Sequence, residues 1–428
     1  MFKQLFTRNS TSHHCHGDFV KSLYSHLKSN QSGHFHSNIC SIQRKMLHID
    51  IDATNETIPR IGCHSPEDIP KIVAERKDHI TSYHGRKLSD PYYWLREREN
   101  GAVRKLIESE NQYQKEKMKP LKNLQDTIFK EIKNRILQTD ESVPYVWKDY
   151  LYYSRTEDGK DYKIYCRKAL GEGKEEEILI DLNELAKELE TDFLELGMYE
   201  ISPDQNIMAF SIDVDGDEFY DLYFKDLSNG KIYSFFFSKE ENLDTSFEFG
   251  NDSRTVVFAV CDEAHRPFRV YRKTLEMNSF VDKLEDCEPL SVKAECELIF
   301  EELDEKFFVS VSKTLSEEFI FVDTCSNNTS EYYYVRTDDL PKDNLKLFAN
   351  KKRKEGVEFY ISHHTKHFYV WHNDDGFVNF RLMRTPVENP DFNNLEEVLP
   401  YNSEFYIEDL ICFKNHLALF GRSEGVPN

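Results

Sequence analysis

One pentapeptide near the end of the printed sequence has the spacing of a serine nucleophile. Gly421-Arg422-Ser423-Glu424-Gly425 fits the G-x-S-x-G pattern, in which a strained strand-to-helix turn exposes the serine hydroxyl for attack on a carbonyl carbon. Such a serine needs a helix directly after it and an Asp and a His later in the chain. Only three residues follow Gly425. We therefore interpret the pentapeptide as a hairpin turn and expect no catalytic residue in this chain.

Two further groups have the residue types of a metal site. In the segment 213–218 (Asp-Val-Asp-Gly-Asp-Glu) the glycine is fourth, and position twelve of the corresponding loop is Phe224. A calcium-binding EF-hand loop needs Gly at position six and Glu at position twelve, so the segment predicts a turn. Residues 13–16 (His-His-Cys-His) are ligand types, but no second ligand cluster accompanies them. We expect no metal and no cofactor.

A third group suggests acid–base chemistry. His363, His364 and His367 precede Asp374 and Asp375, and imidazole–carboxylate pairs commonly carry out proton transfer. The segment alternates like a strand and its turn, so neighbouring residues point to opposite faces, and no nucleophile accompanies it in the sequence. We predict surface or packing histidines.

Composition excludes several classes of protein. Lys and Arg number 55 and Asp and Glu 77 among 428 residues, a formal net charge of −22. This excess of acid argues against nucleic-acid binding, which depends on basic residues. The mean hydropathy is −0.66, and no apolar run is long enough to cross a membrane. The nine cysteines are scattered without a CxxC pair, as in an intracellular protein with free thiols.

The first 48 residues differ in charge from the rest. They contain six basic residues and one acidic residue, which leaves 49 basic against 76 acidic residues elsewhere, a net of −27. A leader that is Ser-rich, His-rich and poor in acid has the composition of a mitochondrial presequence. A disordered extension or a misassigned start is the equal alternative. We expect a cytoplasmic protein, with the mitochondrion as the second location.

The secondary structure that would position a site changes from helices to strands along the chain. Within 97–138, Leu124, Ile128, Ile132 and Ile136 recur every fourth residue, which predicts helices broken near Pro120. We expect this apolar stripe to pack on the body of the protein. From about Val143 the period changes to two, and Asp-Gly between aromatic runs predicts hairpins. Only 181–192 is helical or loop-like beyond that point.

The hairpins repeat. An aromatic-x-apolar strand recurs every 48 to 61 residues, starting at Tyr162, Tyr220, Phe268, Phe319 and Phe380, and each copy follows another strand. A unit of about 50 residues and four short strands is the size of a propeller blade; an irregular series of sandwiches is the alternative. A sixth unit begins at 405–409 and 416–420, and the printed sequence ends near its turn. We therefore expect an unfinished propeller with an unpaired strand edge.

Residues 73–96 resemble the N-terminal signature of oligopeptidase B, in the prolyl oligopeptidase family of serine peptidases. The matching residues are His79, His84, Gly85, Asp90, Tyr93, Trp94, Leu95 and Arg96, whereas Asp78 stands where a proline is usual. The resemblance continues through Glu110-Asn111, Ser202-Pro203-Asp204, 216–220, 226–230, Lys313-Thr314 and 381–385. Prolyl endopeptidase-like hydrolases are similar in the later repeats and match 73–167 less well.

The resemblance implies a mainly β fold: an incomplete seven-bladed-type β-propeller of about five and a half blades, after an α-helical N-terminal segment. We expect a leader at 1–70, a helical extension at 71–142 and a propeller at 143–428, without the α/β-hydrolase domain. In the family, the propeller admits short peptides, and oligopeptidase B cleaves after Arg or Lys. The implied partners are short basic peptides once a catalytic domain is joined, and neither nucleic acid nor membrane.

Three functions stay open from the sequence. The first is the propeller part of an oligopeptidase B-like peptidase, inactive by itself, with a gene-model, splicing or pseudogene origin for the short chain. The second is a non-catalytic propeller that binds partners, and the third is pairing with a separately encoded hydrolase domain.

Overall fold

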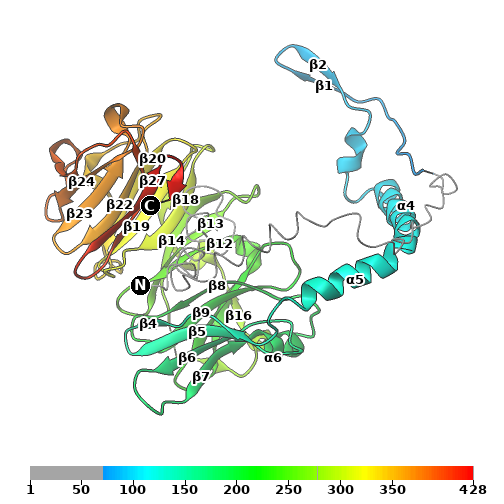
Figure 1. Cartoon of the computed structure of the whole chain (residues 1–428), viewed down its shortest axis with the longest axis horizontal. Helices are drawn as coiled ribbons and strands as arrows, with labels where there is room; N and C mark the ends of the chain where they lie inside the picture. Colours follow the sequence, from blue (N-terminus) through cyan, green and yellow to red (C-terminus); the bar gives the residue numbers. More distant parts are fainter. Residues whose placement is uncertain (1–70, 277, 428) are drawn as a thin grey trace, which may run out of the picture. The chain divides into compact units, whose positions relative to one another are not determined.

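The computed structural model describes residues 71–427 except residue 277 (Figure 1). The predictions for the basic leader, for residues 13–16 and for Cys40 and Cys63 lie outside the described residues. A division at residue 138 separates two units, 71–138 and 139–427, and each is described by itself. In the part of the chain that the structure describes, no helix is both long enough and apolar enough to cross a membrane.

The first unit contains a hairpin and two helices. The strands β1 (Ile80–Tyr83) and β2 (Arg86–Ser89) pair antiparallel, and His84 and Gly85 between them both have positive φ. The 3-10 turn η2 (Tyr93–Arg96) leads to α4 (Gly101–Met118), η3 (Lys119–Leu121) and α5 (Lys122–Lys133). The Asn100 side chain caps α4 by accepting from the Ala102 amide at 2.9 Å. Pro120 lies in η3, as the predicted break between helices requires.

The apolar stripe of the helices is not buried within its own unit. Leu124, Ile128, Phe129 and Ile132 are 45%, 47%, 64% and 55% exposed. Among the helical residues described in this unit, Val103 alone is buried. No described element of this unit covers the stripe, and its packing on the body of the protein stays a prediction.

The second unit consists of six antiparallel sheets in sequence order, which we name blades 1 to 6 (green to red in Figure 1). Blade 1 contains β3 (Asp140–Glu141), β4 (Tyr145–Trp147), β5 (Tyr150–Thr156), β6 (Ile164–Ala169) and β7 (Glu176–Asp181). Blade 2 contains β8 (Glu195–Ile201), β9 (Ile207–Asp213), β10 (Asp221–Asp226) and β11 (Ile232–Phe237). Blade 3 contains β12 (Leu243–Phe249), β13 (Thr255–Cys261), β14 (Pro267–Thr274) and β17 (Glu297–Glu301).

The later blades follow the same order. Blade 4 contains β18 (Phe308–Lys313), β19 (Phe319–Cys325), β20 (Ser330–Arg336) and β21 (Lys346–Leu347). Blade 5 contains β22 (Phe359–His364), β23 (His367–His372), β24 (Arg381–Pro386) and β25 (Glu396–Leu399). Blade 6 contains β26 (Phe405–Cys412), β27 (Leu417–Ser423) and β28 (Val426–Pro427). The expected sequence of blades is confirmed, with a sixth sheet of three strands.

Shorter elements lie in the connections between these strands. They are α6 (Leu182–Glu188), η4 (Lys239–Glu241), η5 (Leu284–Asp286), α7 (Val292–Glu295), η6 (Phe348–Asn350), η7 (Asp374–Gly376) and η8 (Phe392–Asn394). Asp181 caps α6 by accepting from the amides of Asn183 and Glu184. The segments β15 (Phe280–Val281) and β16 (Glu288–Leu290) leave the β14–β17 connection and pair with the edge of β11, which protects that edge from other chains.

The hydrophobic core consists of five layers, each between two successive blades. Alternation along the second strands assigns the side chains to layers, because neighbouring residues of a strand point to opposite faces. In β19, Ile320 and Val322 pack toward blade 3, whereas Phe319 and Phe321 pack toward blade 5. The strands β9, β13 and β23 divide their apolar residues in the same way. This stacking of two-sided sheets is that of a propeller.

One detail of the predicted repeat was wrong. In blades 1, 2, 3 and 5 the matched pair of strands is the second and third of its sheet, but in blade 4 it is the first and second, β18 and β19. The true third strand of blade 4 is β20. Both pairs are antiparallel with apolar residues on both faces, so their patterns are alike.

Candidate functional site: the hairpin turns of the propeller

Six hairpin turns follow the inner strands of the blades. The strands β8, β12, β18, β22 and β26 each lie at one edge of their sheet, and β12 contacts both β8 and β18. We define the turn row as the connections that follow β4 and these five strands: 148–149, 202–206, 250–254, 314–318, 365–366 and 413–416. Polar side chains from separate blades meet there.

The turns share a backbone feature. Five of them contain a non-glycine residue with positive φ: Lys148 at 50°, Gln205 at 65°, Ser253 at 60°, Glu317 at 62° and Thr365 at 55°. Such residues belong in tight turns, where a left-handed position reverses the chain. Because the position recurs from blade to blade, the turns present their side chains in a repeated way.

Hydrogen bonds join each turn, or the last residues of the strand before it, to the next blade in order. Lys148 Nζ donates to the Pro203 carbonyl at 2.6 Å, and Gln205 Nε2 donates to the Trp147 carbonyl at 3.1 Å. Between blades 2 and 3, the Asp204 amide donates to Ser253 Oγ at 3.0 Å. The remaining neighbours are joined by Asn251 Nδ2 to the Glu317 carbonyl, Ser316 to His363, and His364 Nε2 to the Lys414 carbonyl.

One contact joins blades that are not neighbours. Trp147 Nε1 of blade 1 donates to Glu317 Oε1 of blade 4 at 2.7 Å, and Lys148 Nζ lies 3.2 Å from Glu317 Oε2. Burial acts to raise the pKa of Glu317, but the hydrogen bond from Trp147 and the charge of Lys148 outweigh it and hold the pKa below its usual value. The carboxylate is therefore ionised at neutral pH.

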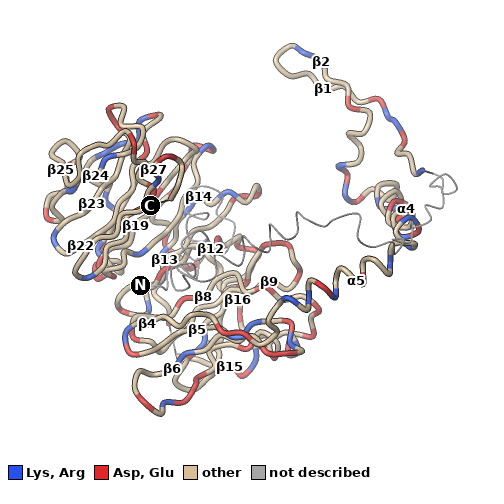
Figure 2. Tube along the Cα trace, viewed as in Figure 1, with Lys and Arg blue, Asp and Glu red and all other residues tan. Residues whose placement is uncertain are grey.

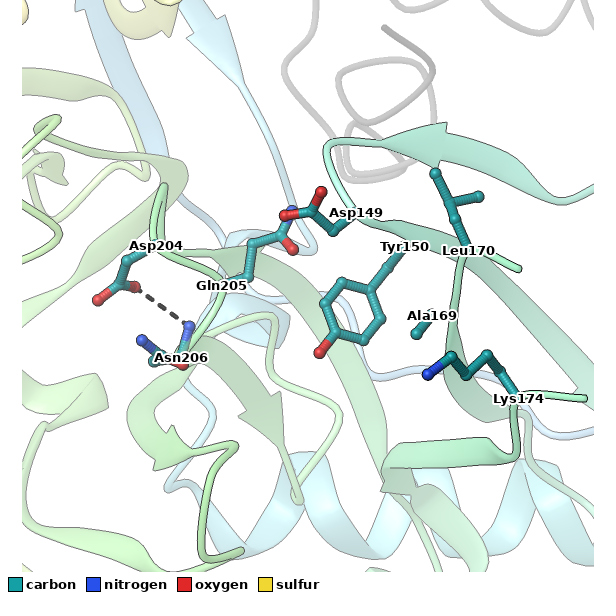
Figure 3. A pocket seen from close by; sticks show the side chains of 8 residues that line it. All are labelled: Asp149, Tyr150, Ala169, Leu170, Lys174, Asp204, Gln205 and Asn206. Carbon is teal, nitrogen blue, oxygen red and sulfur yellow. Dashed lines mark hydrogen bonds between the residues drawn. The ribbon is translucent and has the colours of Figure 1, made fainter. Parts of the chain in front are cut away.

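A polar pocket of about 370 Å³ lies between the first two turns. Its lining is Asp149, Tyr150, Ala169, Leu170, Lys174, Asp204, Gln205 and Asn206. In Figure 3 the Tyr150 ring lies between Asn206 on one side and Ala169 and Lys174 on the other. Groups of both charges and an aromatic ring can bind and orient a peptide side chain, but they supply no nucleophile–base pair.

A second pocket, of about 240 Å³, lies between blades 1 and 2. Its aromatic wall is made by Tyr145, Tyr153, Tyr165 and Tyr199, and Lys163 and Glu195 also line it. Two of these rings, Tyr165 and Tyr199, pack edge to face with centroids 5.2 Å apart, an arrangement that stabilises the core layer.

The acidic excess is visible along the chain. Figure 2 shows Asp and Glu distributed over connections of several blades, not gathered in one place. Part of this charge is neutralised within the fold. The Asp374 carboxylate binds Lys351 Nζ at 2.6 Å and Lys354 Nζ at 2.8 Å, and Glu302 and Glu331 bind Arg353.

Ser423 is the last residue of β27. Its Oγ donates to the Glu404 carbonyl at 3.2 Å, and the next two residues, Glu424 and Gly425, have φ of 52° and 77° and connect β27 to β28. Two successive positive φ values are typical of a two-residue hairpin turn. In the structure this serine lies in a hairpin, with its hydroxyl bound to the backbone.

Asp213 organises the segment that resembles a calcium loop. Its side chain is 1% exposed, and its carboxylate accepts from the amides of Asp215, Gly216 and Glu218 at 2.8 to 2.9 Å. The carboxylates of Asp215 and Asp217 bind Lys239. Backbone amides and a lysine therefore occupy these oxygens. Among the described residues, no group of three or more His, Cys, Asp or Glu is placed to hold a metal.

The histidines and aspartates of blade 5 do not come together. His363 is buried, with its Nδ1 2.7 Å from Ser316 Oγ and its Nε2 2.9 Å from the Thr365 carbonyl. A carbonyl only accepts, so Nε2 carries the hydrogen and Nδ1 accepts from the serine hydroxyl. Asp374 follows the other end of β23.

Ser316 and His363 are a pair that sequence reasoning missed, since 47 residues separate them. Burial lowers the pKa of His363, and its second nitrogen binds a carbonyl where a catalytic triad has a carboxylate. The pair holds blades 4 and 5 together. Glu317 was missed for the same reason, because nothing local in the sequence distinguishes it.

His372 predicts how stability depends on pH. It is 1% exposed, its Nε2 accepts from Arg381 Nε at 3.2 Å, and no described group bonds to its buried Nδ1. Burial, and then the charge of Arg381, lower its pKa to about 4. Since the unfolded chain protonates near pH 6.5, acidification from about 6.5 to 4 favours unfolding, by about 3 kcal/mol in total.

We expect His372→Gln to lose stability more slowly than wild type over that pH range, measured as the urea midpoint by circular dichroism. His416→Gln, at an exposed turn of blade 6, serves as the control and follows wild type. Equal pH dependence of His372→Gln and wild type would contradict the assignment.

The six cysteines in the described part are free thiols. Burial raises the pKa of Cys166 to about 12 and that of Cys412 to about 11. Thiols held protonated in this way are poor nucleophiles and poor metal ligands.

Comparison with known proteins relates this propeller to a known family. The family described as prolyl oligopeptidase, N-terminal beta-propeller domain, matches residues 72–428. Protease 2 of Moraxella lacunata is 32% identical over 361 residues, covering 83% of this chain and 49% of the relative. Dipeptidyl aminopeptidase BI of Pseudoxanthomonas mexicana is 26% identical over 377 residues, covering 84% of this chain and 49% of the relative.

Solved structures agree with this placement. Oligopeptidase B from Leishmania major superposes with a TM-score of 0.73 at 24% identity, covering 84% of this chain and 50% of that one. Oligopeptidase B from Trypanosoma brucei gives a TM-score of 0.72 at 25% identity, with the same coverage. The chain thus spans about half the length of the relatives it matches. The chain belongs to the prolyl oligopeptidase family, whose N-terminal β-propeller domain matches residues 72–428.

Proposed function

We propose that this chain admits and selects short basic peptides for an oligopeptidase B-like serine peptidase, and that hydrolysis requires a catalytic domain joined to it. The observation that carries the proposal is the family match over residues 72–428. The net charge of −22 supports the basic preference, because an acidic surface raises the local concentration of cationic peptides.

The exposed stripe of α5 supports an interface with the catalytic domain. Ile128 and Phe129 are 47% and 64% exposed, and a contiguous apolar helix face commonly marks a protein contact. We propose that an apolar surface of the catalytic domain covers it, since relatives carry about as much chain again beyond the matched part.

Hydrolysis tests the proposal. We expect the purified 428-residue chain to leave an arginyl fluorogenic substrate intact, and Ser423→Ala to behave identically, because the Ser423 hydroxyl is bound to a backbone carbonyl. A chimaera carrying the C-terminal half of Moraxella lacunata Protease 2 is expected to cleave that substrate at least 10-fold faster than a glutamyl one. Cleavage by the chain alone that is lost in Ser423→Ala would contradict the proposal.

For location we propose the cytoplasm, with the mitochondrion as the alternative that the basic leader raises. Residues 1–48 fused to a fluorescent protein separate the two, since diffuse signal excludes mitochondrial import and punctate organellar signal excludes the cytoplasm.

A further inference from the structure

The contact of Glu317 with blade 1 differs from the other bonds of the turn row. Bonds between neighbouring turns follow the order of the blades, whereas Trp147 and Lys148 reach Glu317 past blades 2 and 3. Because the inner strands β8, β12 and β18 lie side by side, a bond that skips two blades crosses the space in front of their turns. It therefore holds blade 1 against blade 4 at this end of the propeller.

Another cation can readily replace Lys148 as a partner of Glu317. The Lys148 and Glu317 side chains are 33% and 30% exposed, so solvent reaches the ion pair and its net contribution is small. Lys148 also has a second acceptor, the Pro203 carbonyl at 2.6 Å. Lysine binds a carboxylate as a point charge, whereas a guanidinium binds it through two parallel hydrogen bonds. An arginine side chain from outside can thus replace Lys148.

The surroundings favour such a cation. Asp338 accepts from Asn251 Nδ2 at 2.7 Å, and the same amide lies 3.4 Å from the Glu317 carbonyl. Glu318 follows directly and pairs with Arg336 only at 3.6 Å. In addition, Lys148 Nζ lies 5.0 Å from the centroid of the Trp147 ring. The site therefore offers a cation an aromatic face as well as a carboxylate.

We propose that Glu317 is an exchangeable latch: the guanidinium of an arginine side chain of a short peptide binds both carboxylate oxygens of Glu317 in place of Trp147 Nε1 and Lys148 Nζ. This exchange separates blade 1 from blade 4 and opens this end of the propeller to the peptide. The inference rests on the proposed preference for basic peptides. No covalent step is involved, and Lys148 keeps the Pro203 carbonyl as its partner after displacement.

Hydrogen exchange on the intact 428-residue chain tests the latch without any hydrolysis. We expect millimolar N-acetyl-arginyl-arginine amide to accelerate amide hydrogen exchange at least 5-fold in the segments 145–150 and 314–318 of the chain. N-acetyl-glutamyl-glutamate amide is expected to change nothing. Acceleration in neither segment by the arginine peptide would overturn the proposal.

Variants identify the residue responsible. In Glu317→Gln we expect fast basal exchange and no response to the arginine peptide, whereas the control Glu396→Gln, in an exposed ion pair of blade 5 outside the turn row, responds like wild type. In Lys148→Met the half-saturating peptide concentration is expected to fall several-fold, because the competing ammonium is gone. If folded Glu317→Gln still shows accelerated exchange with the arginine peptide, the proposal is overturned. If that variant does not fold, an unchanged half-saturating peptide concentration in Lys148→Met overturns the proposal instead.

The two proposals fail separately. If the arginine peptide does not change hydrogen exchange but the chimaera cleaves arginyl substrates, the latch is refuted and the proposed selection of basic peptides stands. If the arginine peptide accelerates hydrogen exchange but the chimaera shows no preference for arginine, the latch stands as a binding site and the proposed specificity is refuted.

Discussion

Replacing Arg353 by Ala is expected to lower the free energy of unfolding by about 3–5 kcal/mol at neutral pH. Arg353 Nη2 lies 2.6 Å from Glu302 Oε2 and 2.9 Å from Glu331 Oε2. Both carboxylate side chains are only 6% exposed, so removal of the guanidinium leaves two buried charges without their cation. The guanidinium also stacks on the Phe307 ring at 4.0 Å, and that packing is lost too.

The pH dependence of this effect has a definite sign. Burial acts to raise the pKa of Glu302, but the hydrogen bond from Arg353 and the other donors outweigh it and lower the pKa. The stabilisation is therefore present above the ordinary glutamate pKa and is lost as pH falls through the folded value. We expect the difference between Arg353→Ala and wild type to shrink as the pH falls below about 4.

Urea denaturation followed by circular dichroism measures the change. Arg384→Ala is the matched control, because its pair with Glu396 is exposed on both sides, at 39% and 55%; it is expected to cost about 1 kcal/mol or less. Equal effects of the two arginine substitutions at neutral pH would show that the buried triad contributes nothing special.

Phe368→Ala is expected to cost about 3–5 kcal/mol, a large part of the stability of a typical domain. Phe368 is fully buried in the layer between blades 4 and 5. Its ring centroid lies 4.8 Å from that of Phe319 and 5.2 Å from that of Phe348. Truncation leaves a cavity between two sheets that backbone pairing holds apart, so collapse is restricted.

Two further substitutions calibrate this prediction in the same urea experiment. Phe368→Leu retains most of the volume and is expected to cost less than about 1.5 kcal/mol. Phe308→Ala removes a ring that is 45% exposed and is expected to cost about 1 kcal/mol or less. Similar losses for Phe308→Ala and Phe368→Ala would mean that the layer between blades 4 and 5 does not exist in solution.

Local patterns predicted the elements well. Alternation with period two indicated the strands, and the apolar repeat with Pro120 indicated two helices separated by a break, as α4 and α5 are. These signals depend on neighbours in the chain, because backbone geometry alone sets the periods. The blade 4 copy was misplaced by one strand because β18–β19 and β19–β20 have the same alternating pattern.

The type of fold, the order of the blades and the family could be predicted from the sequence, because each follows from local periodicity or from a motif such as residues 73–96. Which polar residues meet could be seen only in the folded chain. Trp147 and Glu317 are 170 residues apart, and Ser316 and His363 are 47 apart. Contacts between blades depend on how sheets stack, and stacking is set by summed packing of whole faces, which no local pattern of polar residues records.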